Sequence, residues 1–81
     1  MKLQEYLKLL DKNPPDITLT YEQSHELCED ISKMEISDIP KAYYVDMENF
    51  LEERLNSNAV EKNLVVPLEK LLTSLRELIS R

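Results

Sequence analysis

The sequence predicts an all-α fold, a small bundle of about four helices. Apolar residues recur at three- and four-residue spacing along most of the chain, which is the pattern of helices with one buried face. None of the 81 residues is glycine, whereas tight β-hairpin turns and phosphate-binding loops need residues that tolerate positive φ or close backbone approach. A chain of 81 residues has room for one hydrophobic core, so we predict a single domain over residues 1–81.

The first helix is predicted over residues 3–12. Its apolar residues repeat at helical spacing, namely Leu3, Tyr6, Leu7 and Leu10. The segment Asn13-Pro14-Pro15 should end this helix, because proline lacks an amide donor and restricts the residue before it. The connection that follows is expected to be extended, with Ile17 and Leu19 turned toward the bundle.

The second helix is predicted over residues 20–34. Thr20 and Gln23 have the spacing of a capping box, in which the hydroxyl caps an early amide and the Gln23 side chain reaches back. One face carries the apolar residues Leu27, Ile31 and Met34. The opposite face collects the acidic residues Glu22, Glu26, Glu29 and Asp30.

The third helix is predicted over residues 39–55. Asp38 is the expected cap, and Pro40 falls in the first turn, where its missing donor costs little. The apolar face consists of Tyr43, Met47, Phe50, Leu51 and Leu55. Acidic residues flank this face, Glu48 and Glu52 on one side and Asp46 and Glu53 on the other.

The last helix is predicted over residues 66–80. It carries an apolar stripe that the preceding segments must cover: Leu68, Leu71, Leu72, Leu75, Leu78 and Ile79. Pro67 leaves two interpretations, because it either begins this helix or kinks one long helix from Ala59 to Ser80. Proline costs about 3 kcal/mol inside a helix and almost nothing in the first turn. We therefore favour a break near residues 64–66, with a possible short turn at 59–63.

The negative charge of the chain is concentrated in its middle. The formal net charge is −6, but residues 14–57 hold eleven acidic and three basic residues, a net charge of −8, whereas the two ends are each +1. Direct binding of nucleic acid requires the opposite sign, since lysine and arginine supply most of that affinity. The charge distribution predicts a basic protein as the partner.

The sequence contains no set of residues that predicts catalysis, a cofactor or a bound metal. A structural zinc site takes four ligands rich in Cys and His, and the chain has one of each, His25 and Cys28. His25 lies too close to Cys28 on one helix to serve as the base of a nucleophilic pair. We predict that the protein is not an enzyme.

The cysteine content and the lengths of the apolar runs predict the compartment of the protein. A single cysteine cannot form an internal disulfide, and no apolar run approaches the length of a membrane span. We therefore expect a cytoplasmic protein with no membrane partner.

The acidic face and a neighbouring tyrosine pair are the candidate partner-binding surface. Like-charge pairs at i,i+4 each destabilise an isolated helix by about 0.2–0.5 kcal/mol, a cost that a binding role explains. The alternative is a solvated face that only keeps the protein soluble. The predicted binding residues are Glu22, Glu26, Glu29, Asp30, Tyr43, Tyr44, Glu48 and Glu52.

In size, acidity and expected helix number the chain resembles the small immunity proteins that block nuclease bacteriocins. In that family, acidic residues on the second helix and a tyrosine pair on the third form the inhibitory surface, and Tyr43-Tyr44 after the acidic helix is similar. The chain departs from the family in lacking a glycine-containing short third helix and in placing Pro40 before the tyrosines. The resemblance implies a similar role, an inhibitor or antitoxin-like protein bound to a nuclease toxin or another nucleic-acid-binding protein, without implying membership.

The sequence leaves a second function open, a structural protein that forms a helical homo-oligomer such as a homodimer. Val45, Val65 and Val66 supply apolar surface for such an interface. The two functions differ in salt dependence, because salt weakens an acidic interface and leaves an apolar one intact.

Overall fold

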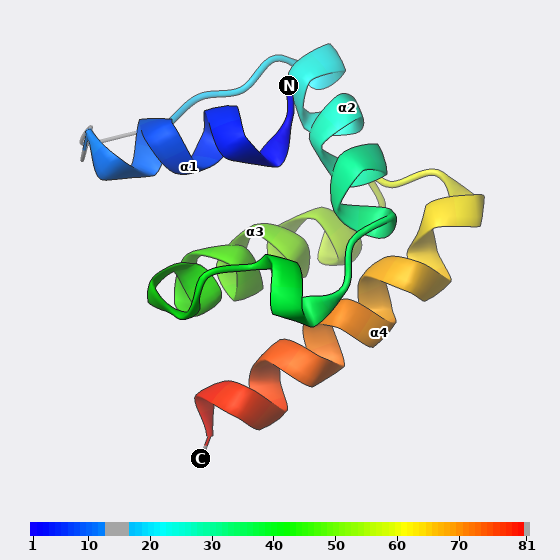
Figure 1. The fold of residues 1–81 in the computed structure, drawn as a ribbon. Helices are drawn as coiled ribbons and strands as arrows, with labels where there is room; N and C mark the ends of the chain where they lie inside the picture. Colours follow the sequence, from blue (N-terminus) through cyan, green and yellow to red (C-terminus); the bar gives the residue numbers. More distant parts are fainter. Residues whose placement is uncertain (13–16, 81) are drawn as a thin grey trace.

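Four α-helices form in the part of the chain that the structure, a computed structural model, describes, residues 1–12 and 17–80 (Figure 1). They are α1 (Leu3–Asp11), α2 (Tyr21–Ser32), α3 (Tyr44–Asn56) and α4 (Lys62–Ile79). Two 3-10 helices, η1 (Ile36–Asp38) and η2 (Lys41–Tyr43), lie between α2 and α3, and these described residues include no strand. The all-α prediction is confirmed. The predicted helix stop at Asn13-Pro14-Pro15 lies outside the described residues.

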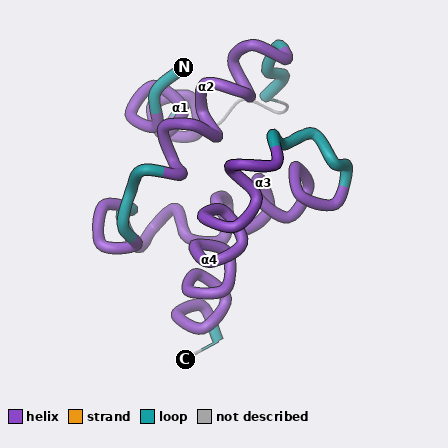
Figure 2. The backbone as a smooth tube through the Cα atoms, turned by 90° about the vertical axis from the view of Figure 1, so that its right-hand side faces the viewer, coloured by secondary structure: helices purple, strands orange, loops and turns teal. Residues whose placement is uncertain are grey.

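Helix α4 is the element on which the others pack. It makes its most extensive contact with α3 and further contacts with α2 and η1, while α1 packs on α2 (Figures 1 and 2). The most deeply buried large side chains come from three helices: Leu27, Ile31, Met47, Leu51, Leu68 and Leu75. The leucine stripe of α4 is therefore covered by α2 and α3, as its pattern predicts.

The start of α2 and the end of α3 follow local sequence signals. The Gln23 amide donates to the Thr20 hydroxyl at 3.1 Å, and the Thr20 amide donates to the Gln23 side chain at 3.0 Å. This is the predicted capping box. At the end of α3, Asn58 takes a positive φ of 56°, and the Ala59 amide donates to the Arg54 carbonyl at 3.2 Å. Asparagine thus occupies the left-handed position that glycine commonly fills at helix ends.

The predicted break near residues 64–66 is wrong. Helix α4 begins at Lys62 and runs through Pro67 as its sixth residue. Leu64, one turn before Leu68, is buried and extends the apolar stripe, a gain of about 1.5–3 kcal/mol for an aliphatic side chain. Pro67 leaves the carbonyl of Asn63 without its helical donor, but Asn63 is exposed, so water can satisfy it. Core burial therefore offsets the cost of the proline.

The third helix begins later than residue 39. Ile39 and Pro40 are extended, at φ −98°, ψ 120° and φ −61°, ψ 139°, and η2 precedes the start of α3 at Tyr44. A residue before proline disfavours the helical region, and Ile39 is 2% exposed, so the extended backbone also places its side chain in the core. Asp38 does not cap α3; its carboxylate accepts the Glu35 amide at 3.0 Å within the η1 turn.

The helix lengths also bear on membrane association. Among the described residues, no helix combines the length and the apolar character that crossing a bilayer requires.

Candidate functional site

The predicted acidic residues of α2 are largely engaged within the chain. The Glu26 carboxylate accepts a hydrogen bond from the N-terminal ammonium of Met1. This hydrogen bond, together with the ammonium charge, lowers the pKa of Glu26. Asp30 accepts the Leu3 amide at 2.8 Å and lies 3.7 Å from the Lys2 ammonium. These two acids hold the start of α1 against α2.

The other two predicted acids of α2 differ in their surroundings. A Glu29 oxygen lies 3.0 Å from Nε2 of His25, one turn earlier on α2. The same Nε2 lies 3.3 Å from a carboxylate oxygen of Glu61, the residue that precedes α4. Glu22 is exposed on the first turn of α2. Among the described residues, Glu22 is therefore the one acid of the four whose carboxylate makes no ion pair or hydrogen bond.

The predicted acids of α3 face a basic residue of α4. The Arg76 guanidinium places Nη2 3.1 Å from a Glu52 oxygen and Nε 3.6 Å from a Glu48 oxygen. One arginine thus compensates the like-charge i,i+4 pair that the sequence shows. The acids of α2 and of α3 therefore contact different neighbours within the described chain, and their role as one partner-binding surface stays a prediction.

The two predicted tyrosines point to different parts of the molecule. The Tyr43 hydroxyl donates to the carboxylate of Asp11 in α1, and this hydrogen bond is the main cause that raises the pKa of Tyr43. Tyr44 is half-buried and lines a groove of about 490 Å³ with Lys41, Val45, Leu78 and Ile79. Tyr43 therefore helps to hold α1, while Tyr44 belongs to an apolar groove beside the end of α4.

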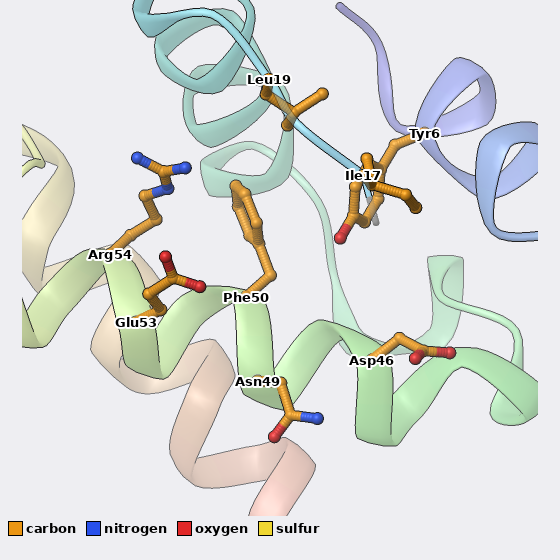
Figure 3. Close-up of a pocket in the computed structure, with 8 residues that line it drawn as sticks. All are labelled: Tyr6, Ile17, Leu19, Asp46, Asn49, Phe50, Glu53 and Arg54. Atoms are coloured by element: carbon orange, nitrogen blue, oxygen red, sulfur yellow. The ribbon is translucent and has the colours of Figure 1, made fainter. Parts of the chain in front are cut away.

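A cavity of about 210 Å³ lies between α1, the segment before α2, and α3 (Figure 3). We call it the α3 notch, and its lining residues are Tyr6, Ile17, Leu19, Asp46, Asn49, Phe50, Glu53 and Arg54. The rings of Tyr6 and Phe50 meet at 5.5 Å between centroids, tilted by 48°. The Arg54 guanidinium carbon lies 5.6 Å from the Phe50 ring centroid. An apolar wall is thereby bordered by charged residues of α3.

The α3 notch has a negative electrostatic character. Burial raises the pKa of the Tyr6 hydroxyl, and the charges of Asp46 and Glu53 raise it further, while Arg54 acts in the opposite direction. Both carboxylates are exposed to solvent. Nε of Arg54 is buried without a hydrogen-bond partner among the described residues, and its guanidinium lies against the Phe50 ring.

Asp46 and Glu53 are candidate site residues that the sequence prediction omitted. Their spacing of seven residues puts them on one side of α3, so the sequence alone could have suggested them as a pair. The sequence does not show that Tyr6 lies beside them, because α1 reaches α3 only through tertiary packing. No protein-family profile, curated protein or solved structure gives a significant match to this chain.

Proposed function

We propose that this protein is a non-enzymatic binding module that captures a basic protein by taking a lysine or arginine side chain into the α3 notch. The observation that carries this proposal is the apolar wall of the notch, in which the Tyr6 and Phe50 rings are largely buried, beside the exposed carboxylates of Asp46 and Glu53. The Arg54 guanidinium lies against the Phe50 ring, so two carboxylates and one guanidinium leave the charged lining with a net negative charge. Long basic side chains bury their aliphatic stems on apolar surface and keep their charged heads in polar surroundings. A notch with both features suits such a residue.

The charge distribution supports the same class of partner. Residues 14–57, which include all of α3, carry a net charge of −8. A field of this sign attracts basic proteins, including those that bind nucleic acid, and it speeds association more than it increases affinity. Glu48 and Glu52 contribute to this field, but a partner that bound them directly would have to replace Arg76. We therefore place direct contact at Asp46 and Glu53 and long-range attraction at the other acids.

A short arginine-containing peptide is a defined probe for the α3 notch. In an NMR titration of the full chain, we expect amide shifts to concentrate at residues 46–54 and at Tyr6. The double variant Asp46→Asn/Glu53→Gln should weaken binding about tenfold, a loss of about 1.4 kcal/mol. Raising the salt concentration should weaken it as well.

The matched control is Glu69→Gln/Glu77→Gln, which makes the same charge change at exposed positions of α4. This control should retain the shifts at the α3 notch. Equal weakening by both double variants would mean that only net charge attracts the peptide, and the proposal would then be wrong. Shifts spread over all acidic residues would lead to the same conclusion.

A second candidate function is self-association through the groove at Tyr44. Val45 in its lining is 54% exposed, and apolar surface at a groove favours contact with a second copy of the chain. Sedimentation equilibrium at low and high salt separates the candidates. A dimer that persists at high salt and is lost in Val45→Lys supports self-association; a monomer at all concentrations excludes it.

A further inference from the structure

The imidazole of His25 faces two carboxylates that come from different helices. Its Nε2 lies 3.0 Å from a Glu29 oxygen and 3.3 Å from a Glu61 oxygen, and the three ligand atoms all lie within 4.8 Å of one another. His25 and Glu29 are one turn apart on α2, and Glu61 directly precedes α4, which packs on α2 (Figure 1). The sequence prediction of no metal considered His25 with Cys28, whereas the structure adds a ligand 36 positions further along the chain.

The geometry points to a binding site for a divalent transition-metal ion, of the chemical class of Zn²⁺, formed by His25, Glu29 and Glu61. Around zinc with bonds of about 2.0–2.2 Å, neighbouring ligand atoms in a tetrahedron lie about 3.3–3.6 Å apart. The distances from Nε2 are close to this range, so small side-chain movements suffice to close the site. An imidazole ligand favours zinc, copper or nickel over magnesium or calcium, which prefer oxygen ligands.

The three side chains are oriented before any ion binds. The His25 ring stacks on that of Tyr21, with 8° between the planes and 6.2 Å between the centroids. Glu61 occupies the N-cap position of α4, yet its side chain makes no capping hydrogen bond to that helix. Its carboxylate is instead turned toward His25. Orientation of this kind lowers the entropy that ligands lose when they bind an ion.

Charge balance also favours a cation at this position. Glu29 and Glu61 bring two negative charges to one nitrogen, and they repel each other unless a positive charge lies between them. A divalent ion at this position supplies two positive charges. The side chains are 27%, 48% and 51% exposed for His25, Glu29 and Glu61, so water can complete the coordination. The site shares no residue with the α3 notch.

Calorimetric titration of the full chain with zinc chloride tests the site. We expect one ion per chain and a raised melting temperature, because an ion that binds the folded chain stabilises it. Glu61→Gln and His25→Asn should each weaken binding at least about tenfold, since each removes one of three ligands. Glu61→Gln is the sharper variant, because it leaves the i,i+4 pair on α2 intact.

Two control variants separate this site from nonspecific binding. Glu22→Gln makes the same charge change one turn from His25, and Cys28→Ala removes the chain's only thiol; both should bind zinc as the wild type does. Binding that Glu61→Gln leaves unchanged, or that Cys28→Ala abolishes, would overturn the proposal. So would a melting temperature that zinc leaves unchanged, which would identify the cluster as contacts within the chain only.

Discussion

The carboxylate of Asp30, near the end of α2, accepts a hydrogen bond from the Leu3 amide at the start of α1, at 2.8 Å. Lys2 occupies the N-cap position of α1 and provides no side-chain cap. Asp30 therefore performs for α1 the role that an N-cap residue usually performs, from 27 positions away. Its negative charge also lies at the positive end of the α1 dipole. An acid that the sequence marks as a binding residue is thus a structural link between two helices.

Replacing Asp30 should destabilise the protein through α1. Asp30→Ala removes both the cap and the ion pair with Lys2, and we expect the free energy of unfolding to fall by about 0.5–2 kcal/mol. Asp30→Asn keeps an acceptor oxygen and should cost less. Urea unfolding followed by circular dichroism measures both, with Glu22→Gln as the exposed control on the same helix. An Asp30→Ala midpoint equal to that of the wild type would contradict the capping role.

The ionisation of Tyr6 reports on the α3 notch. Burial and the charges of Asp46 and Glu53 raise the pKa of Tyr6, so Asp46→Asn/Glu53→Gln should move this pKa back toward its ordinary value. The measurement is ultraviolet titration of phenolate, with Tyr6→Phe to assign the signal. Asp11→Asn is the matched control: it removes the carboxylate whose hydrogen bond and charge raise the pKa of Tyr43, and it should leave the pKa of Tyr6 unchanged. A pKa of Tyr6 that is the same in the double variant and in the wild type would contradict the electrostatic basis of the proposed function.

The same pKa shift fixes the direction of a pH effect on stability. Folding raises the pKa of Tyr6 above its unfolded value of about 10, so the folded state favours the protonated hydroxyl. The stability linked to Tyr6 is fully present below the unfolded pKa and is lost as the pH rises through the folded pKa. We expect the urea midpoint to fall in this alkaline range, and to fall less in Tyr6→Phe.

Pro67 lies inside α4, and its replacement should stabilise the protein. Pro67→Ala restores the amide donor toward the Asn63 carbonyl and removes the ring's clash with the preceding turn, a gain of up to about 3 kcal/mol. The greater freedom of the unfolded chain opposes this by about 0.4–1 kcal/mol, so we expect a net gain of about 2 kcal/mol by urea unfolding. Val66→Ala, at a neighbouring exposed position, should change stability by less than about 0.5 kcal/mol. A destabilised Pro67→Ala would show that the proline is required where it lies.

The parts of the fold that the sequence predicts are those with local causes. The capping box at Thr20 and the leucine stripe of α4 depend on residues a few positions apart, because helical geometry relates them directly. The start of α4 was missed because the burial of Leu64 depends on what packs against it. An estimate based only on the local cost of Pro67 inside a helix does not include the free energy gained by burying Leu64.

The candidate site was harder to predict because its partners are distant in sequence. Asp30 is 27 positions from Leu3, and Arg76 is 24 positions from Glu52. An acidic helix face therefore looks uncompensated until the fold brings a base or an amide to it. The α3 notch has the same origin, since Phe50 and Tyr6 meet only when α1 lies over α3.

The core under α4 offers a last prediction, with a chemical readout. Leu75 is fully buried, so Leu75→Ala should lower the free energy of unfolding by about 2–5 kcal/mol. Leu78, half-buried on the same helix, is the control and should cost less when changed to alanine. Cys28 is 2% exposed, and burial raises its pKa, so its thiol should react with alkylating reagents only when the core opens. Leu75→Ala should therefore speed alkylation of Cys28 far more than Leu78→Ala does. Equal rates in the two variants would place Cys28 outside the cooperative core that α4 organises.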